Sequence, residues 1–121
     1  MDFQEGVSIY LQIARTIEDD ILAGTLLPEA AAPSTNALAR YYQINPATAL
    51  KGVNLLVEKG ILYKKRGVGM FVSAGAKEQI IRERREEFFQ KQLPALIAQA
   101  EKLGVDRQTL CNAILKEEKE E

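Results

Sequence analysis

The chain has 121 residues, enough for one small core and an appendage, and its 46% hydrophobic and 27% charged residues are typical of a folded protein. It contains no histidine and one cysteine, which excludes zinc sites of the Cys/His kind and catalysis by a histidine base. We therefore expect no metal, no cofactor and no enzymatic activity, and the short apolar stretches and the lack of a signal-like N-terminus predict a cytoplasmic protein with no membrane contact.

The net charge of −1 hides an uneven distribution along the chain. Residues 1–32 contain one basic and six acidic side chains, whereas residues 33–75 contain six basic and one acidic. Residues 76–121 are nearly balanced, with nine basic and ten acidic side chains. Only the middle segment can present a positive surface to a polyanion, and local rather than net charge governs nucleic-acid binding.

The first predicted element is an amphipathic helix over residues 8–23, because isoleucine recurs there every four residues, at Ile9, Ile13, Ile17 and Ile21. Gly24 should end this helix. Residues 25–33 hold two prolines and should be extended. Ser34 can then cap a short helix through Tyr42, although Ala37 replaces the Glu or Gln of a full capping box.

Asn45 followed by Pro46 is a strong start for the next helix, which should run to Lys59 and end at Gly60. Its spacing predicts a buried face and an outer face. The buried face would hold Ala49, Val53, Leu56 and Val57, and the outer face Pro46, Ala47, Thr48, Lys51 and Asn54. Residues 61–73 then predict a β-hairpin that turns near Gly67 and Gly69.

Residues 77–103 carry a helical apolar stripe that Pro94 should kink or split, and Asp106 can cap a last helix. The stripe could pack back on the preceding unit, but a 75-residue unit largely completes its own core, which favours self-association. Cys111 should be a buried packing residue. The residues expected to dimerise are Ile81, Phe88, Phe89, Leu93, Leu96, Ile97, Leu110 and Ile114.

The order helix, short helix, tight turn, helix and hairpin predicts a mainly α fold, a winged helix-turn-helix at residues 1–75 with a helical dimerisation segment at 76–121. The second helix of such a pair lies in the major groove, and the hairpin is the wing. The candidate DNA-binding residues are Ser34, Thr35, Asn36, Asn45, Ala47, Thr48, Lys51, Lys64, Lys65, Arg66 and Gly67.

Residues 24–72 carry a resemblance to the GntR family of bacterial regulators. The matching motifs are IYLQIARTIEDDILAG in the first helix, PSTNALA at the second, NPAT at the start of the third, and LVEKGILYKKRGVGMFV across the end of that helix and the wing. The short length resembles the YtrA-type branch, in which the C-terminal segment dimerises. The resemblance implies a homodimeric, sequence-specific regulator, a repressor, on a palindromic double-stranded DNA operator. The alternative is a winged helix used for protein–protein contact without DNA binding, and control by a small-molecule effector stays open.

The second helix departs from the family pattern Leu-Pro-Ser-x-Arg-Glu-Leu, because Asn36 replaces an arginine commonly used on DNA and residues 29–32 read EAAA. Asn36 can still hydrogen-bond a base or phosphate, with one charge fewer. Other roles are open as well: Ser34 and Asn45 can serve as helix caps, and Arg40 can contact phosphate or pair with Glu58.

Overall fold

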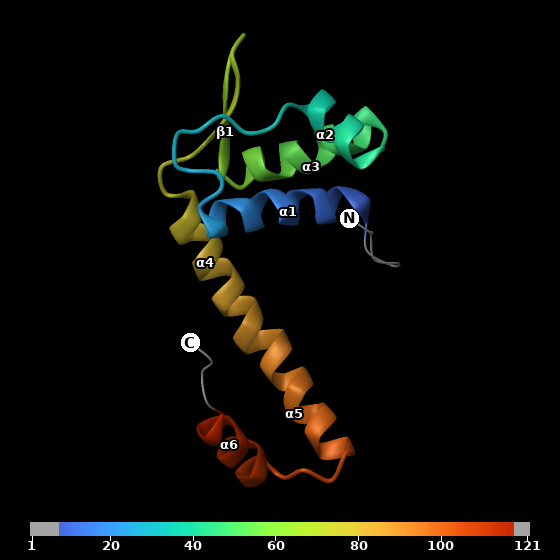
Figure 1. The fold of residues 1–121 in the computed structure, drawn as a ribbon, viewed down its shortest axis with the longest axis vertical. Helices are drawn as coiled ribbons and strands as arrows, with labels where there is room; N and C mark the ends of the chain where they lie inside the picture. Colours follow the sequence, from blue (N-terminus) through green and yellow to red (C-terminus); the bar gives the residue numbers. More distant parts are fainter. Residues whose placement is uncertain (1–7, 118–121) are drawn as a thin grey trace. The chain divides into compact units, whose positions relative to one another are not determined.

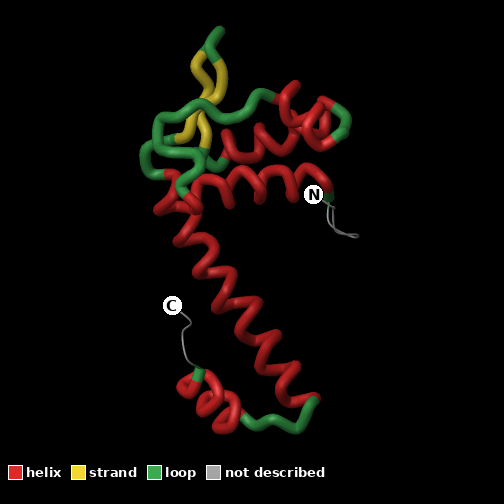
Figure 2. The backbone as a smooth tube through the Cα atoms, in the orientation of Figure 1, coloured by secondary structure: helices red, strands yellow, loops and turns green. Residues whose placement is uncertain are grey.

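The computed structural model describes residues 8–117, which form helices and one β-hairpin (Figures 1 and 2). This confirms the predicted mainly α fold with a hairpin wing. None of the described helices is long and apolar enough to cross a bilayer. In chain order the elements are α1 (Ile9–Ala23), α2 (Thr35–Tyr42), α3 (Pro46–Glu58), β1 (Leu62–Lys65), β2 (Gly69–Val72), α4 (Ala76–Glu87), the π-helix η1 (Phe88–Gln92), α5 (Leu93–Lys102) and α6 (Arg107–Lys116).

The described residues divide into two compact units, the first ending at Arg82 and the second beginning at Glu83. The division lies within α4, later than the expected boundary at residue 75. The reason is packing, because Ala76 and Ile80 on the first turns of α4 are fully buried in the core of the first unit. The start of the long helix therefore completes the winged unit.

The core of the first unit forms where α1 packs along α3 and α3 packs on α2. Gly52 allows α1 and α3 to approach closely, since a Cβ there would lie 2.8 Å from the Tyr10 carbonyl oxygen of α1. The predicted isoleucine stripe is correct from Ile13 onward, but Ile9 is 40% exposed and Val57 is only partly buried. The buried apolar side chains of this core are Ile13, Ala14, Ile17, Ile21, Leu38, Ala39, Ala49, Val53, Leu56, Ile61, Leu62, Val72, Ala76 and Ile80.

An ion pair ties α1 to the end of α3. The Lys59 ammonium lies 3.0 Å from the carboxylate of Glu18, a side chain that is largely buried. The Gln79 side-chain amide donates to the Lys59 carbonyl over 2.7 Å, which joins α4 to the same point. Lys59 belongs to the basic middle segment, but its charge is directed into the fold rather than toward a ligand.

The wing is an antiparallel hairpin in which Leu62 pairs with Val72 and Lys65 with Gly69. Its base has a third partner that the sequence did not reveal. Residues 29–32, expected only to be extended, run beside β2: the Glu29 amide donates to the Val72 carbonyl over 2.8 Å and the Ala32 amide to the Met70 carbonyl over 2.9 Å. These bonds satisfy the outer edge of β2 and fasten the hairpin to the helices.

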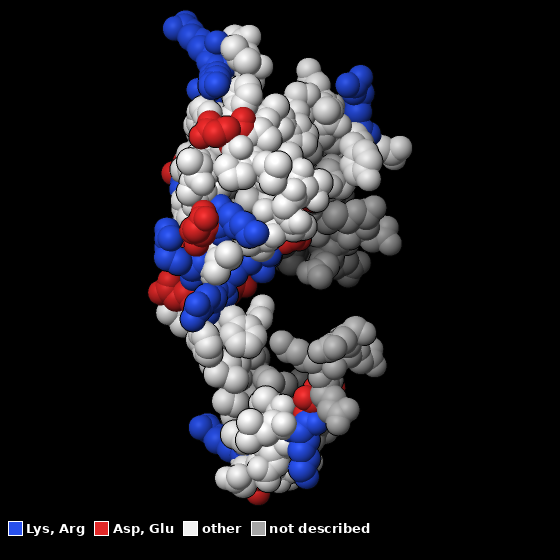
Figure 3. All heavy atoms as spheres, turned by 60° about the vertical axis from the view of Figure 1, so that its left-hand side comes forward, with Lys and Arg blue, Asp and Glu red and all other residues white. Residues whose placement is uncertain are grey.

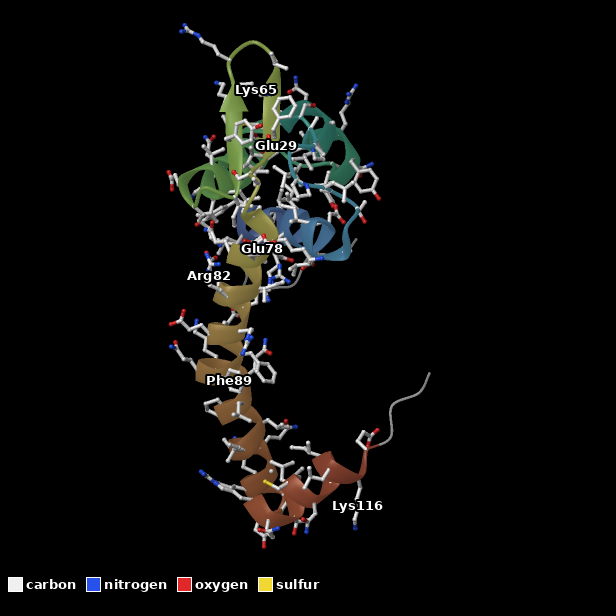
Figure 4. The ribbon with its side chains drawn as sticks, turned by 90° about the vertical axis from the view of Figure 1, so that its left-hand side faces the viewer. Glu29, Lys65, Glu78, Arg82, Phe89 and Lys116 are labelled. Carbon is white, nitrogen blue, oxygen red and sulfur yellow. The ribbon has the colours of Figure 1, made fainter. Side chains whose placement is uncertain are left out.

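The Tyr63 hydroxyl adds a side-chain link between the wing and this edge segment, because it donates to the Glu29 carboxylate. That hydrogen bond, together with the negative charge of Glu29, raises the pKa of the Tyr63 phenol. Figure 4 shows Glu29 near the base of the hairpin and Lys65 further along it. The base of the wing is thus held by backbone and side-chain bonds, whereas its tip extends beyond them.

In the second unit the helix is split as Pro94 predicted, but the irregular turn precedes the proline. Pro94 has no N–H to donate to the carbonyl four residues earlier, and the chain instead forms the π-helix η1, in which the Leu93 amide bonds to the Phe88 carbonyl. Pro94 then lies in the first turn of α5, where a missing N–H costs little. Cys111 is exposed, so its expected burial is wrong for the single chain.

Candidate nucleic-acid interface

Two side-chain caps fix the helix-turn-helix. The Ser34 Oγ accepts from the Ala37 amide over 3.1 Å at the start of α2, and the Asn45 Oδ1 accepts from the Ala47 amide over 2.8 Å at the start of α3. Between them Gln43 takes a left-handed conformation, with φ 55°, that ends α2 and allows the tight turn. Ser34 and Asn45 therefore act as caps, and DNA contact by either stays a prediction.

The outer face of α3 is exposed as its helical spacing predicted. Ala47 and Lys51 are exposed, and the Lys51 ammonium lies 4.1 Å from the centre of the Tyr10 ring on α1. Thr48 is only half-buried, because it lies between the outer face and the core. The other exposed residues of α3 are Pro46, Leu50, Asn54 and Glu58.

The N-terminal part of α2 flanks this face. Asn36 is exposed and Thr35 half-buried, and Asn36, Arg40 and Pro46 line a shallow hollow between α2 and the start of α3. Arg40 is exposed, and no ion pair between Arg40 and Glu58 occurs among residues 8–117. The alternative pairing with Glu58 is therefore not seen in the described residues, and phosphate contact by Arg40 stays a prediction.

The tip of the wing gathers positive charge. Lys64, Lys65 and Arg66 are all exposed, and Figure 3 shows Lys and Arg side chains grouped at the end of the hairpin. The Lys65 ammonium lies 4.7 Å from the centre of the Phe71 ring. Gly67 has φ 76°, which residues with a Cβ rarely adopt, so the turn itself requires glycine.

Sequence reasoning missed two exposed apolar side chains in these segments, Leu50 on α3 and Val68 at the wing tip. The signal for Leu50 was available. Residues 47, 50, 51 and 54 follow the i, i+3, i+4, i+7 spacing of one helical face, and this face is opposite to Ala49, Val53 and Leu56.

This geometry defines a winged helix-turn-helix, the DNA-binding domain of a transcriptional regulator. The sequence pattern of the family described as "Bacterial regulatory proteins, gntR family" matches residues 9–72, and the chain belongs to this family. Within the family it is a regulator of the YtrA type. It is 31% identical over 110 residues to the HTH-type transcriptional repressor YtrA of Bacillus subtilis, a match that covers 91% of this chain and 84% of that protein.

Solved structures agree with this assignment. A GntR family transcriptional regulator from Listeria monocytogenes is similar with a TM-score of 0.77 and 25% identity, covering 96% of this chain and all of the other. The DNA-binding domain of AraR, solved in complex with operator ORX1, is similar with a TM-score of 0.53 and 31% identity, covering 60% of this chain and 93% of that one. These relatives are transcriptional regulators, which confirms the expectation that the chain is not an enzyme.

Proposed function

We propose that this regulator is a sequence-specific repressor that binds a palindromic operator as a homodimer. The observation that carries the proposal is the exposed outer face of α3 together with the cationic tip of the hairpin. In this arrangement α3 enters the major groove, and Lys64, Lys65 and Arg66 reach phosphates and the adjacent minor groove. Repression is supported by the name of the relative YtrA, a transcriptional repressor.

Self-association is supported by the apolar side chains that a single chain leaves uncovered in its second unit. Phe88, Phe89, Leu96 and Ile114 are exposed, and Leu93, Ile97 and Leu110 are only partly buried. Ile81 of α4 is exposed as well. Two-fold pairing through such surfaces joins two weak half-site contacts into one tight contact, and it makes the operator palindromic.

Selection of bound duplexes from a random DNA pool tests the proposal, followed by mobility-shift titration of the selected duplex at several salt concentrations. We expect a palindrome and a steep salt dependence, because phosphate contacts release counterions. Arg66→Ala should weaken binding and lower the slope of log K against log[salt] by about one. Lys51→Ala should also weaken binding, whereas Lys116→Ala, an exposed lysine at the end of α6, is the matched control.

Analytical ultracentrifugation of the same samples reports the oligomeric state. A monomer that shifts no duplex at low ionic strength would contradict the whole proposal. A protein-interaction role for the winged unit predicts that no duplex is shifted even at low salt. Binding by a monomer would contradict only the homodimer. Unchanged affinity for both Lys51→Ala and Arg66→Ala would show that the interface has been assigned to the wrong residues.

A further inference from the structure

We propose that α3 reads thymine through its 5-methyl group, with Leu50 and Ala47 as the specificity-determining contacts. This inference rests on the proposed function, since it concerns the base pairs that face α3 in the operator. The inference goes beyond the proposed function by naming a chemical feature of each operator half-site. Each half-site must place at least one thymine methyl against the N-terminal half of α3.

The first step is the position of Leu50. Helical spacing puts Ala47, Leu50, Lys51 and Asn54 on one face of α3, and all four are exposed. Leu50 is 43% exposed and lies at the border of the buried face, whereas Val53 and Leu56 within that face are buried almost completely. Leu50 belongs neither to the core cluster nor to the side chains packed against it. Leu50 is therefore an apolar side chain on the exposed outer face of α3, the face that is available to a ligand.

The second step is the chemistry of that ligand. Lys51 stands on the same face, and the wing supplies Lys64 and Arg66, so the surface around Leu50 suits a polyanion better than an apolar protein surface. In the major groove of unmodified DNA, the apolar group that a base pair presents is the thymine C5-methyl. Leu50 and Ala47 offer no hydrogen bond, so contact with that methyl is the discrimination available to them.

The third step is the neighbouring amide. Asn54 is exposed one turn beyond Leu50, and an asparagine side chain forms a bidentate pair with adenine at N6 and N7. An apolar pair followed by an amide on one face therefore favours A·T pairs in the half-site. Lys51 on the same face can pair with guanine, so a G·C pair can stand beside the A·T pairs. An aspartate or glutamate would have favoured cytosine, but Glu58 lies at the far end of the helix, away from the first turns that enter the groove.

Deoxyuridine tests this directly, because it lacks only the methyl group and keeps every hydrogen bond of thymine. Each thymine of the selected duplex is replaced in turn by deoxyuridine, and the affinity of the unaltered protein is measured by mobility shift. Burial of one methyl corresponds to about a fourfold change in binding, so we expect about a fourfold loss at one or two positions in each half-site. The other positions should change little.

Leu50→Ala identifies the contact. With this variant the sensitive position should no longer distinguish thymine from deoxyuridine. Leu27→Ala, which truncates an exposed leucine outside α3, should keep the full pattern. The scan with the unaltered protein needs no variant, so its result stands even if Leu50→Ala folds poorly.

Uniform tolerance of deoxyuridine across a duplex that the protein binds would overturn this inference and leave the proposed function intact. Half-sites selected without any thymine would overturn it as well. If no duplex is bound at all, both the proposed function and this inference fail. Persistence of the sensitive position in Leu50→Ala would assign the methyl contact to another side chain and refute the role given to Leu50.

Discussion

The contact between α1 and α3 at Gly52 gives a prediction that runs against the usual effect of replacing glycine in a helix. Alanine in a helix interior is more favourable than glycine by about 1 kcal/mol, so propensity alone predicts that Gly52→Ala stabilises the protein. Here the new Cβ would lie 2.8 Å from the Tyr10 carbonyl oxygen and 3.3 Å from Cβ and Cγ2 of Ile13.

Packing should outweigh propensity at this position. The carbonyl oxygen would have to retreat by about 0.6 Å to reach an ordinary contact, and it belongs to a helix backbone rather than to a flexible side chain. Overpacking of this kind costs about 1–3 kcal/mol. Since Ile13 crowds the same Cβ, we expect the upper part of that range, and a net loss of about 1–2 kcal/mol after the propensity gain.

Thermal unfolding followed by circular dichroism measures this loss. For a unit of this size it corresponds to a Tm lower by about 5–15 °C. Gly75→Ala is the matched control, because a Cβ there meets nothing within 4 Å, and it should change the free energy of unfolding by no more than about 0.5 kcal/mol. A Gly52→Ala protein as stable as the unaltered one would refute the packing argument and show that α1 and α3 separate easily.

Two further predictions concern the turn and the wing. Asn45→Ala removes the cap that accepts from the Ala47 amide and should destabilise the fold by about 1 kcal/mol in urea denaturation, whereas Asn45→Asp should retain most of the stability; equal losses would argue against capping. Glu29 holds the pKa of Tyr63 above its ordinary value, so this contact stabilises the fold below a pH of about 10 and is lost as the pH rises through the raised pKa. Glu29→Gln should lower the pKa of Tyr63. This pKa is measured from the tyrosinate absorbance as the pH rises, with Tyr63→Phe giving the contribution of the other tyrosines. An unchanged pKa would contradict the contact.

Helix positions could be predicted from the sequence because each one is marked by local chemistry. Ser34, Asn45 and Asp106 accept hydrogen bonds from the amides that helix starts leave free, and all three cap helices as expected. The hairpin could be predicted as well, since the glycines at its turn allow left-handed backbone that other residues avoid. These signals act over four or five residues and need no knowledge of tertiary structure.

What could not be predicted depends on residues far apart in the chain. Pairing of residues 29–32 with β2 has no local signal, because the EAAA segment has no strand-like alternation. The burial of Ala76 and Ile80 depends on where α4 meets the core. The exposure of Leu50 could not be predicted for a different reason. Its helical spacing places it on the outer face of α3, but an apolar residue is expected to be buried, and only the positions of the neighbouring helices show that nothing covers it.

Four cations of the candidate interface, one on α3 and three on the wing, differ in what they give up when they bind a phosphate. Lys51 and Lys65 each lie over an aromatic ring, so moving either ammonium to a phosphate gives up an interaction of about 0.5–1 kcal/mol at an exposed site. Lys64 and Arg66 have no such partner among the described residues, and they give up only hydration. The tip of the wing should therefore supply most of the salt-dependent affinity. The outer face of α3 carries a single lysine beside apolar and amide side chains, and it contributes mainly discrimination between base pairs.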